Sequence, residues 1–108
     1  MRGASIIIFA MFVLATLTAG CASESKTNNI ELAVEKCIEE CRARVAKGEN
    51  LEYGPCLSNR IDDDWVCDIA HDPRQEIDNM KENQCDEYGK NAHHFVEVDT
   101  NCDVIRIY

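Results

Sequence analysis

The side chains of this chain that could bind a metal ion or move a proton are three histidines and an excess of acids. His71, Asp72 and His93 are the candidate metal ligands, because imidazole and carboxylate groups stay available to a metal when cysteines are oxidised. Adjacent residues of a strand point to opposite faces, so His93 and His94 are not expected to bind one ion together. A site would need His71, one of that pair and a carboxylate, all distant in sequence. The sequence therefore predicts no resident metal or cofactor, and the three residues remain candidate ligands.

The sequence contains no recognisable catalytic constellation. No serine or cysteine stands near a histidine in a nucleophile motif, and there is no glycine-rich phosphate loop. The acidic run Asp62–Asp64 lacks the spaced ligands and turn glycine of a calcium loop, which predicts a solvated turn. The string "WVCDIAHDP" resembles a fragment of the secreted phospholipases, in which a His and an Asp activate water over calcium. Pro73 follows Asp72 where the helix of that family runs on. No residue is therefore predicted to be catalytic.

Seven cysteines are the strongest signal in the composition. An exported protein favours an even number of paired cysteines, so one of the seven needs a separate explanation. We expect Cys21 to be a lipid anchor, with a free or intermolecular thiol as the alternative. The other six are expected to form three disulfides: Cys37, Cys41, Cys56, Cys67, Cys85 and Cys102. The sequence suggests a local Cys56–Cys67 bridge, with the two cysteines of the helix pairing with Cys85 and Cys102 in an order that it does not determine.

The first twenty residues have the pattern of an export signal. Arg2 precedes an apolar run from Ile6 to Leu14, which is too short for a membrane span of about 20 residues. The following "LTAGC" resembles a prokaryotic lipoprotein signal, although Leu17 lies four residues before Cys21, where that family has three. Cleavage by a general signal peptidase is the alternative. The sequence predicts a signal peptide over 1–20, a flexible tether over 21–27 and a cysteine-rich globular domain over 28–108.

Charge and size limit the partners and the core. The formal net charge is −9, and loss of Arg2 with the leader leaves 10 basic and 20 acidic side chains. Such a surface repels phosphate backbones, so no nucleic acid is expected as a partner, and membrane contact is expected only through a lipid on Cys21. A domain this small buries about 60 to 65% of its unfolded surface, so the disulfides are expected to supply much of its stability.

Apolar periodicity predicts a small α+β domain. An amphipathic helix is expected from about Asn28, with Asn28 and Glu31 as a capping pair and Gly48 as the C-terminal cap. Its apolar stripe comprises Ile30, Val34, Cys37, Cys41 and Val45. Period-two patterns predict a short strand over 65–70 and a C-terminal β-hairpin formed by "HHFVEVD" and "VIRIY". A helical turn is expected before Cys85, and the helix should pack on the strand and the hairpin.

Strings such as "GPCLSN", "DWVCDIAHDPR", "ENQCDEY" and "HFVEVD" resemble those of small exported cysteine-rich proteins of prokaryotes, archaea among them. That resemblance implies a location and disulfides, and no known activity. The expected function is that of a noncatalytic exported or membrane-anchored envelope protein, acting as a binding module. The alternative is a metal-binding protein or metal-dependent hydrolase centred on His71. A secreted inhibitor or toxin is a third class, which the tether and the anchor disfavour.

Overall fold

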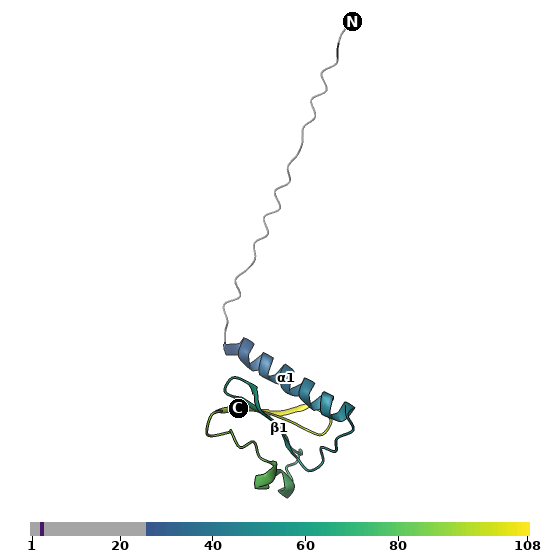
Figure 1. The fold of residues 1–108 in the computed structure, drawn as a ribbon, viewed down its shortest axis with the longest axis vertical. Helices are drawn as coiled ribbons and strands as arrows, with labels where there is room; N and C mark the ends of the chain where they lie inside the picture. Colours follow the sequence, from purple (N-terminus) through teal and green to yellow (C-terminus); the bar gives the residue numbers. More distant parts are fainter. Residues whose placement is uncertain (1–2, 4–25) are drawn as a thin grey trace.

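The computed structural model describes residue 3 and residues 26–108. The predicted signal peptide, the Cys21 anchor and most of the predicted tether lie outside these residues. Helix α1 spans Lys26–Ala46 and lies across one side of a sheet (Figure 1). The architecture is therefore α+β, as predicted. None of the helices in the described part of the chain combines the length and the apolar character that a membrane span requires.

Helix α1 begins two residues before the predicted start of the domain. Asn28 consequently lies inside the helix, so its predicted role as a cap is wrong. The stripe is buried at its centre, at Cys37 and Cys41, whereas Ile30 and Val45 at its two ends are 38% and 49% exposed. Gly48 ends the helix in the predicted left-handed conformation, with φ of 80° and an N–H that donates to the carbonyl of Val45 over 2.9 Å.

The sheet has four strands in the order of the chain. They are β1 (Cys56–Asp62), β2 (Trp65–Ile69), β3 (His94–Val98) and β4 (Val104–Ile107). The predicted strand appears as β2, and the predicted hairpin as the antiparallel pair of β3 and β4. Strand β1 was not predicted, because its sequence follows Gly54 and Pro55 and does not alternate. It is an edge strand whose pairing with β2 is interrupted by two register shifts.

Strands β2 and β3 are parallel neighbours, so the chain must cross over between them. The crossover carries two short 3-10 helices, η1 (Glu76–Asn79) and η2 (Lys81–Asn83), where a helical turn was predicted. Figure 1 shows α1 on one side of the sheet and these turns at the opposite end of the molecule. All five residues of β2 are buried, because this central strand is covered on both faces.

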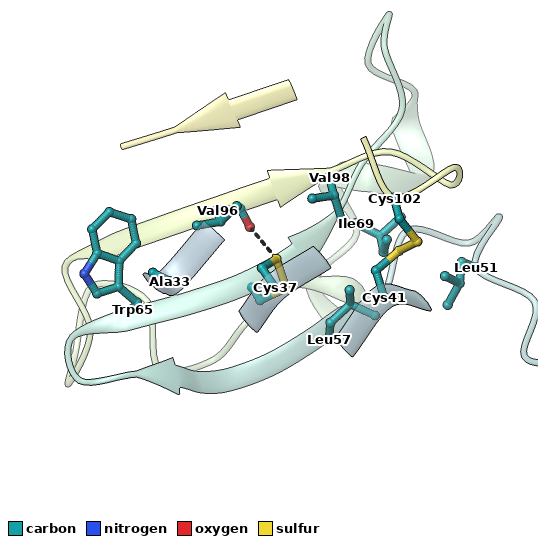
Figure 2. Close-up of a cluster of buried hydrophobic side chains, with 11 residues drawn as sticks. Ala33, Cys37, Cys41, Leu51, Leu57, Trp65, Ile69, Val96, Val98 and Cys102 are labelled. Carbon is teal, nitrogen blue, oxygen red and sulfur yellow. Dashed lines mark hydrogen bonds between the residues drawn. A yellow bond between two sulfur atoms is a disulfide. The ribbon is translucent and has the colours of Figure 1, made fainter. Parts of the chain in front are cut away.

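The main core lies between α1 and the sheet (Figure 2). Alternation along the strands turns Trp65, Cys67 and Ile69 of β2 towards the helix. Val96 and Val98 of β3 share that side, and the predicted packing of the hairpin against the helix and Trp65 is confirmed. Trp65 also stacks on His94, with ring centroids 4.7 Å apart. A smaller apolar cluster on the other face of the sheet contains Val66, Cys85 and Ala92.

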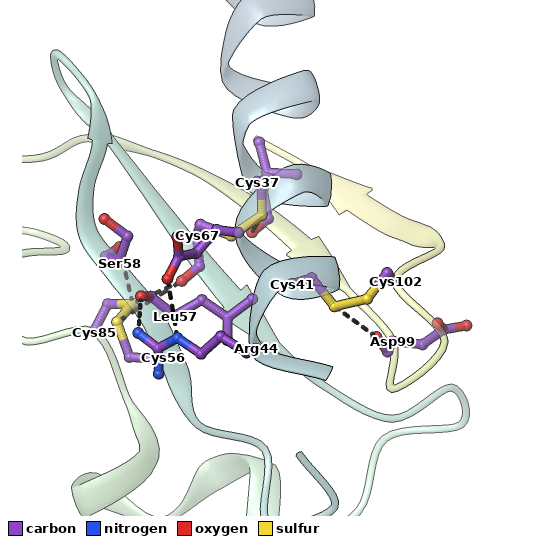
Figure 3. The surroundings of a disulfide bond; sticks show 12 residues. Cys37, Cys41, Arg44, Cys56, Leu57, Ser58, Cys67, Cys85, Asp99 and Cys102 are labelled. Carbon is purple, nitrogen blue, oxygen red and sulfur yellow. Dashed lines mark hydrogen bonds and ion pairs between the residues drawn. A yellow bond between two sulfur atoms is a disulfide. The ribbon is translucent and has the colours of Figure 1, made fainter. Parts of the chain in front are cut away.

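All six predicted framework cysteines are paired, and Figure 3 shows the bridges. The pairs are Cys37–Cys67, Cys41–Cys102 and Cys56–Cys85. The predicted Cys56–Cys67 bridge is wrong. Cys56 lies opposite Asp68 in the β1–β2 ladder and therefore shares the sheet face away from α1, whereas Cys67 faces the helix. The two helix cysteines do bind different partners, as expected, but Cys37 takes Cys67 instead of Cys85.

Candidate functional site: an acid-floored pocket on the far face of the sheet

Three ionisable residues form a row across the sheet face that points away from α1. Asp68 of β2 lies opposite Glu97 of β3, and Glu97 lies opposite Arg106 of β4. Residues two apart on a strand share a face, so Val66 and Phe95 stand beside this row. The far face of the sheet therefore combines buried acids, a basic side chain and apolar neighbours.

This face forms the floor of a pocket of about 230 Å³. The crossover supplies one wall, through Arg74, Gln84, Cys85 and Tyr88. Tyr88 meets the ring of Phe95 edge to face, with centroids 5.3 Å apart. The Cys56–Cys85 bridge fastens this wall to β1. Sheet and crossover together thus enclose a small space with charged and aromatic lining.

Asp68 is the unusual member of the pocket. The residue is only 8% exposed, and its Oδ1 has no hydrogen-bond partner within residues 26–108. Burial, and then the neighbouring charge of Glu97, raise the pKa of Asp68 to about 8. The carboxyl consequently carries a proton at neutral pH. A buried polar atom without a partner is uncommon in native proteins and needs an explanation.

Glu97 is buried too, at 5% exposure, but it has a partner. Nη1 of Arg74 lies 3.2 and 3.3 Å from its two carboxylate oxygens. Nε of Arg74 donates to Oδ1 of Asn79 over 2.7 Å, which holds the guanidinium in place. Arg106 is exposed, and the described residues offer its guanidinium no carboxylate partner. The pocket thus contains one satisfied ion pair and two further groups, the carboxyl of Asp68 and the guanidinium of Arg106, that residues 26–108 leave without a partner.

His71, the predicted centre of a metal site, instead lies between two carboxylates, the buried Asp78 of the crossover and Glu52. Its Nδ1 lies 2.8 Å from Oδ1 of Asp78, and its Nε2 lies 3.3 Å from Oε2 of Glu52. The two ring nitrogens lie on opposite sides of the imidazole, so these carboxylates do not converge on one point. The hydrogen bond to Asp78 is the main cause that raises the pKa of His71.

Asp78 is the best-satisfied acid of the crossover. The backbone amides of His71 and Gln75 donate to its Oδ2 over 3.0 and 2.9 Å. Burial alone would raise the pKa of Asp78, but these amide hydrogen bonds and the imidazole outweigh burial and hold the pKa below its usual value. Gly54 passes so close that a Cβ there would lie 2.6 Å from Oδ1 of Asp78. Asp78 therefore organises the start of the crossover.

The other candidate ligands lie elsewhere. His93 precedes β3, so strand alternation does not separate its side chain from that of His94. Both rings approach Asp64: Nδ1 of His93 lies 2.6 Å from Oδ1, and Nε2 of His94 lies 3.6 Å from Oδ2. His71 follows β2 while His93 precedes the parallel β3, which places them at opposite ends of about 13 Å of strand. Asp72 is exposed. Among the described residues, no three metal-ligating side chains are arranged to hold an ion.

The pocket residues Asp68, Glu97, Arg74 and Arg106 were not predicted from the sequence. A usable signal was present: "WVCDI" and "HFVEV" each place one acid inside an otherwise apolar strand. An acid at such a position must find a partner or keep its proton. Which of the two occurs depends on the residues that cover the strand.

Comparison with known proteins assigns no family. No family model, no curated protein and no solved structure matches this chain. The functional conclusion consequently depends on the geometry of the pocket.

Proposed function

We propose that this protein is a noncatalytic, exported binding module of the cell envelope and that it holds a small ligand in the pocket above Asp68. The observation that carries the proposal is the buried Oδ1 of Asp68, which has no partner among residues 26–108. Leaving a buried polar group unsatisfied costs about 1–3 kcal/mol. A ligand that donates a hydrogen bond to this oxygen would recover that free energy.

The lining of the pocket supports binding over catalysis. The pocket-lining part of residues 26–108 contains no histidine or serine, and its one cysteine is bridged. Glu97 is the only other acid of the lining, and both of its oxygens are already bound to Arg74. A nucleophile paired with a base, which covalent catalysis requires, is therefore missing from the lining.

The proposed location is supported by the disulfides and by the N-terminal sequence. Three bridges are typical of oxidising compartments outside the cytosol. Lipidation of Cys21 would tether the domain to a membrane. In a prokaryotic host, Cys21→Ser should then release the protein from the membrane fraction, while Ser25→Ala leaves it there. Recovery of the wild type in soluble form with an unmodified Cys21 would contradict the anchor.

The binding proposal is tested by thermal melting of the oxidised protein with amines, amino acids, sugars, organic acids and divalent metal ions. Ligands that bind the folded state raise the melting temperature in proportion to the logarithm of their concentration. We expect one class of organic molecule in this panel to raise the melting temperature. Asp68→Asn should abolish the shift, and the exposed Asp72→Asn should retain it.

Two results would contradict the binding proposal. One is the absence of a shift with any organic compound at millimolar concentration. The other is a shift by zinc or another divalent ion that His71→Gln removes and Asp68→Asn retains. That second result would favour the metal-binding alternative.

A further inference from the structure

The two unsatisfied groups of the pocket are the carboxyl group of Asp68 and the guanidinium of Arg106, and this pair suggests the chemistry of the ligand. We infer that the ligand is a small zwitterion, an α-amino acid with an apolar side chain, whose ammonium group binds Asp68 and whose carboxylate binds Arg106. This inference rests on the proposed function and names the ligand class for the same site.

The environment of Asp68 favours an ammonium group. Asp68 lines the pocket and is only 8% exposed, and its Oδ1 is closed to solvent without a partner among residues 26–108. We therefore place the donor of the ligand at this carboxyl group, which must turn towards the pocket to meet it. A cationic donor stabilises the ionised carboxylate, which burial and Glu97 otherwise disfavour. Phe95 and Tyr88 stand in the same lining, and aromatic faces attract cations.

The environment of Arg106 favours a carboxylate group. Arg106 lies directly opposite Glu97 in the β3–β4 ladder, yet Glu97 binds Arg74 from the crossover instead. The Arg106 guanidinium therefore keeps its N–H donors, which match a carboxylate in a bidentate arrangement. An anionic group of a ligand is the partner that this geometry leaves room for.

The spacing of the row suits one small molecule. Asp68 and Arg106 are separated by the single strand β3, so their Cα atoms are about 10 Å apart. We place the ligand between these two side chains, so that its neighbouring ammonium and carboxylate groups bridge them. The pocket, at about 230 Å³, is smaller than the usual 300–1,000 Å³ of ligand sites. Val66, Phe95 and Tyr88 supply apolar surface for a side chain.

The charge balance separates a zwitterion from a simple amine or a simple acid. With Asp68 ionised, Asp68 and Glu97 balance Arg74 and Arg106 in the lining. A zwitterion leaves that balance unchanged, whereas a monovalent amine would add an uncompensated charge to a partly buried site. A simple carboxylate would bind Arg106 while Asp68 keeps its proton, but it would leave Oδ1 of Asp68 without a donor.

The test is calorimetric titration of the purified, oxidised protein with matched probes. L-Leucine carries both charges, 3-methylbutylamine carries only the ammonium, and N-acetyl-L-leucine carries only the carboxylate. L-Alanine and L-valine vary the size of the side chain. At least one of the three amino acids should bind, and L-leucine should bind about tenfold or more tightly than either single-charge probe, because each lost contact is a charge-assisted hydrogen bond.

Variants assign each charge to its residue. Asp68→Asn should weaken L-leucine and 3-methylbutylamine by about tenfold or more and leave N-acetyl-L-leucine unchanged. Arg106→Gln should weaken L-leucine and N-acetyl-L-leucine and leave the amine unchanged. Arg42→Gln, an exposed change on α1 at the other side of the sheet, should alter none of them. Unchanged thermal melting of the variants confirms that they are folded.

The outcomes distinguish this inference from the proposed function. Equal binding of L-leucine and one single-charge probe overturns the zwitterion and leaves a binding module for an amine or an acid. No binding of any of the three amino acids also overturns the zwitterion, and the broader panel of compounds then decides whether the pocket binds anything. Binding of L-leucine that neither Asp68→Asn nor Arg106→Gln weakens places the amino acid outside this pocket and overturns the inference.

Discussion

Two buried aspartates, Asp78 of the crossover and Asp68 of the far face, differ in protonation because their surroundings differ. The carboxylate of Asp78 accepts hydrogen bonds from two backbone amides and one imidazole nitrogen, and these bonds stabilise its ionised form. Asp68 is covered by the same crossover, but its Oδ1 accepts nothing from the described residues. The first acid is therefore a structural anion, whereas the second is the candidate ligand-binding group.

His71 should stabilise the fold more at low pH than at high pH. Its pKa is raised in the folded state, so its bond to Asp78 stabilises the fold fully below the unfolded pKa of about 6.5. That stabilisation is lost as the pH rises through the raised pKa. His71→Gln should therefore lower the free energy of unfolding by about 1.5–3 kcal/mol at pH 5 and by less at pH 9.

Urea unfolding of wild type and variant at pH 5, 7 and 9 measures this difference. His93 is a suitable control, because its side chain is 68% exposed beside Asp64. His93→Gln should have a smaller effect than His71→Gln at each pH. A His71→Gln difference that does not shrink between pH 5 and pH 9 would contradict the assigned ion pair.

The three disulfides connect different parts of the fold. Cys37–Cys67 and Cys41–Cys102 hold α1 against β2 and against the β3–β4 turn. Cys56–Cys85 holds the crossover over the far face. Arg44 adds a contact of its own near the end of α1, since its Nη2 donates to the carbonyl of Leu57 over 2.6 Å (Figure 3). The pocket wall consequently depends on one bridge more than on the other two.

We therefore predict that the Cys56→Ala, Cys85→Ala double variant loosens the crossover and leaves the α1 core intact. The bridge closes a chain segment with a sequence separation of 29, so its loss should cost about 2–4 kcal/mol. Amide hydrogen exchange should accelerate between residues 76 and 92. The amides of α1 and β3 should be less affected, and to the same degree as each other. Equal acceleration throughout α1 and the crossover would show that the bridge supports the whole domain instead.

Periodicity explains which elements were predictable from the sequence. The apolar residues of α1, β2 and the hairpin recur at helical or alternating spacing, and all three were predicted. Strand β1 was missed because its polar, bulged edge lacks alternation. The Cys56–Cys67 pairing failed because it depends on sheet faces, which are fixed only when β1 is known. The row of Asp68, Glu97 and Arg106 was missed for the same reason, since it requires the order and register of three strands.

One small sheet separates two layers of the domain. The helix side contains the main apolar cluster, and the crossover side contains the pocket and only a small cluster. The bridges connect residues 29, 30 and 61 apart in sequence, which removes much conformational freedom from the unfolded chain. The fold is thus stabilised by cross-links on both sides of a limited core.

Reduction should therefore remove cooperative unfolding. Each bridge contributes about 2–4 kcal/mol, and three of them rival the typical total stability of 5–15 kcal/mol. Circular dichroism during heating of the oxidised protein and of the reduced, alkylated protein measures the effect. We expect a sigmoidal transition only for the oxidised form. If the reduced form melts cooperatively at nearly the same temperature, the core itself supplies the stability.

The far face presents a buried acid, Asp68, whose Oδ1 finds no partner among residues 26–108. With a pKa of about 8, Asp68 stays protonated in the folded state between about pH 4 and pH 8, whereas the unfolded chain releases the proton near pH 4. The folded state then binds the extra proton, so Asp68 lowers the free energy of unfolding as the pH rises through this window. A ligand that donates a hydrogen bond to the carboxylate favours the ionised form in the folded state and so opposes this fall in the free energy of unfolding.

The most direct test is a carbon-13 NMR titration of the Asp68 side-chain carboxyl in the oxidised, ligand-free protein, assigned by loss of the signal in Asp68→Asn. We predict a midpoint near pH 8, well above the range of ordinary carboxyl groups. A midpoint near pH 4 would mean that the carboxylate is solvated or already paired, which contradicts the unsatisfied pocket and the function proposed for it.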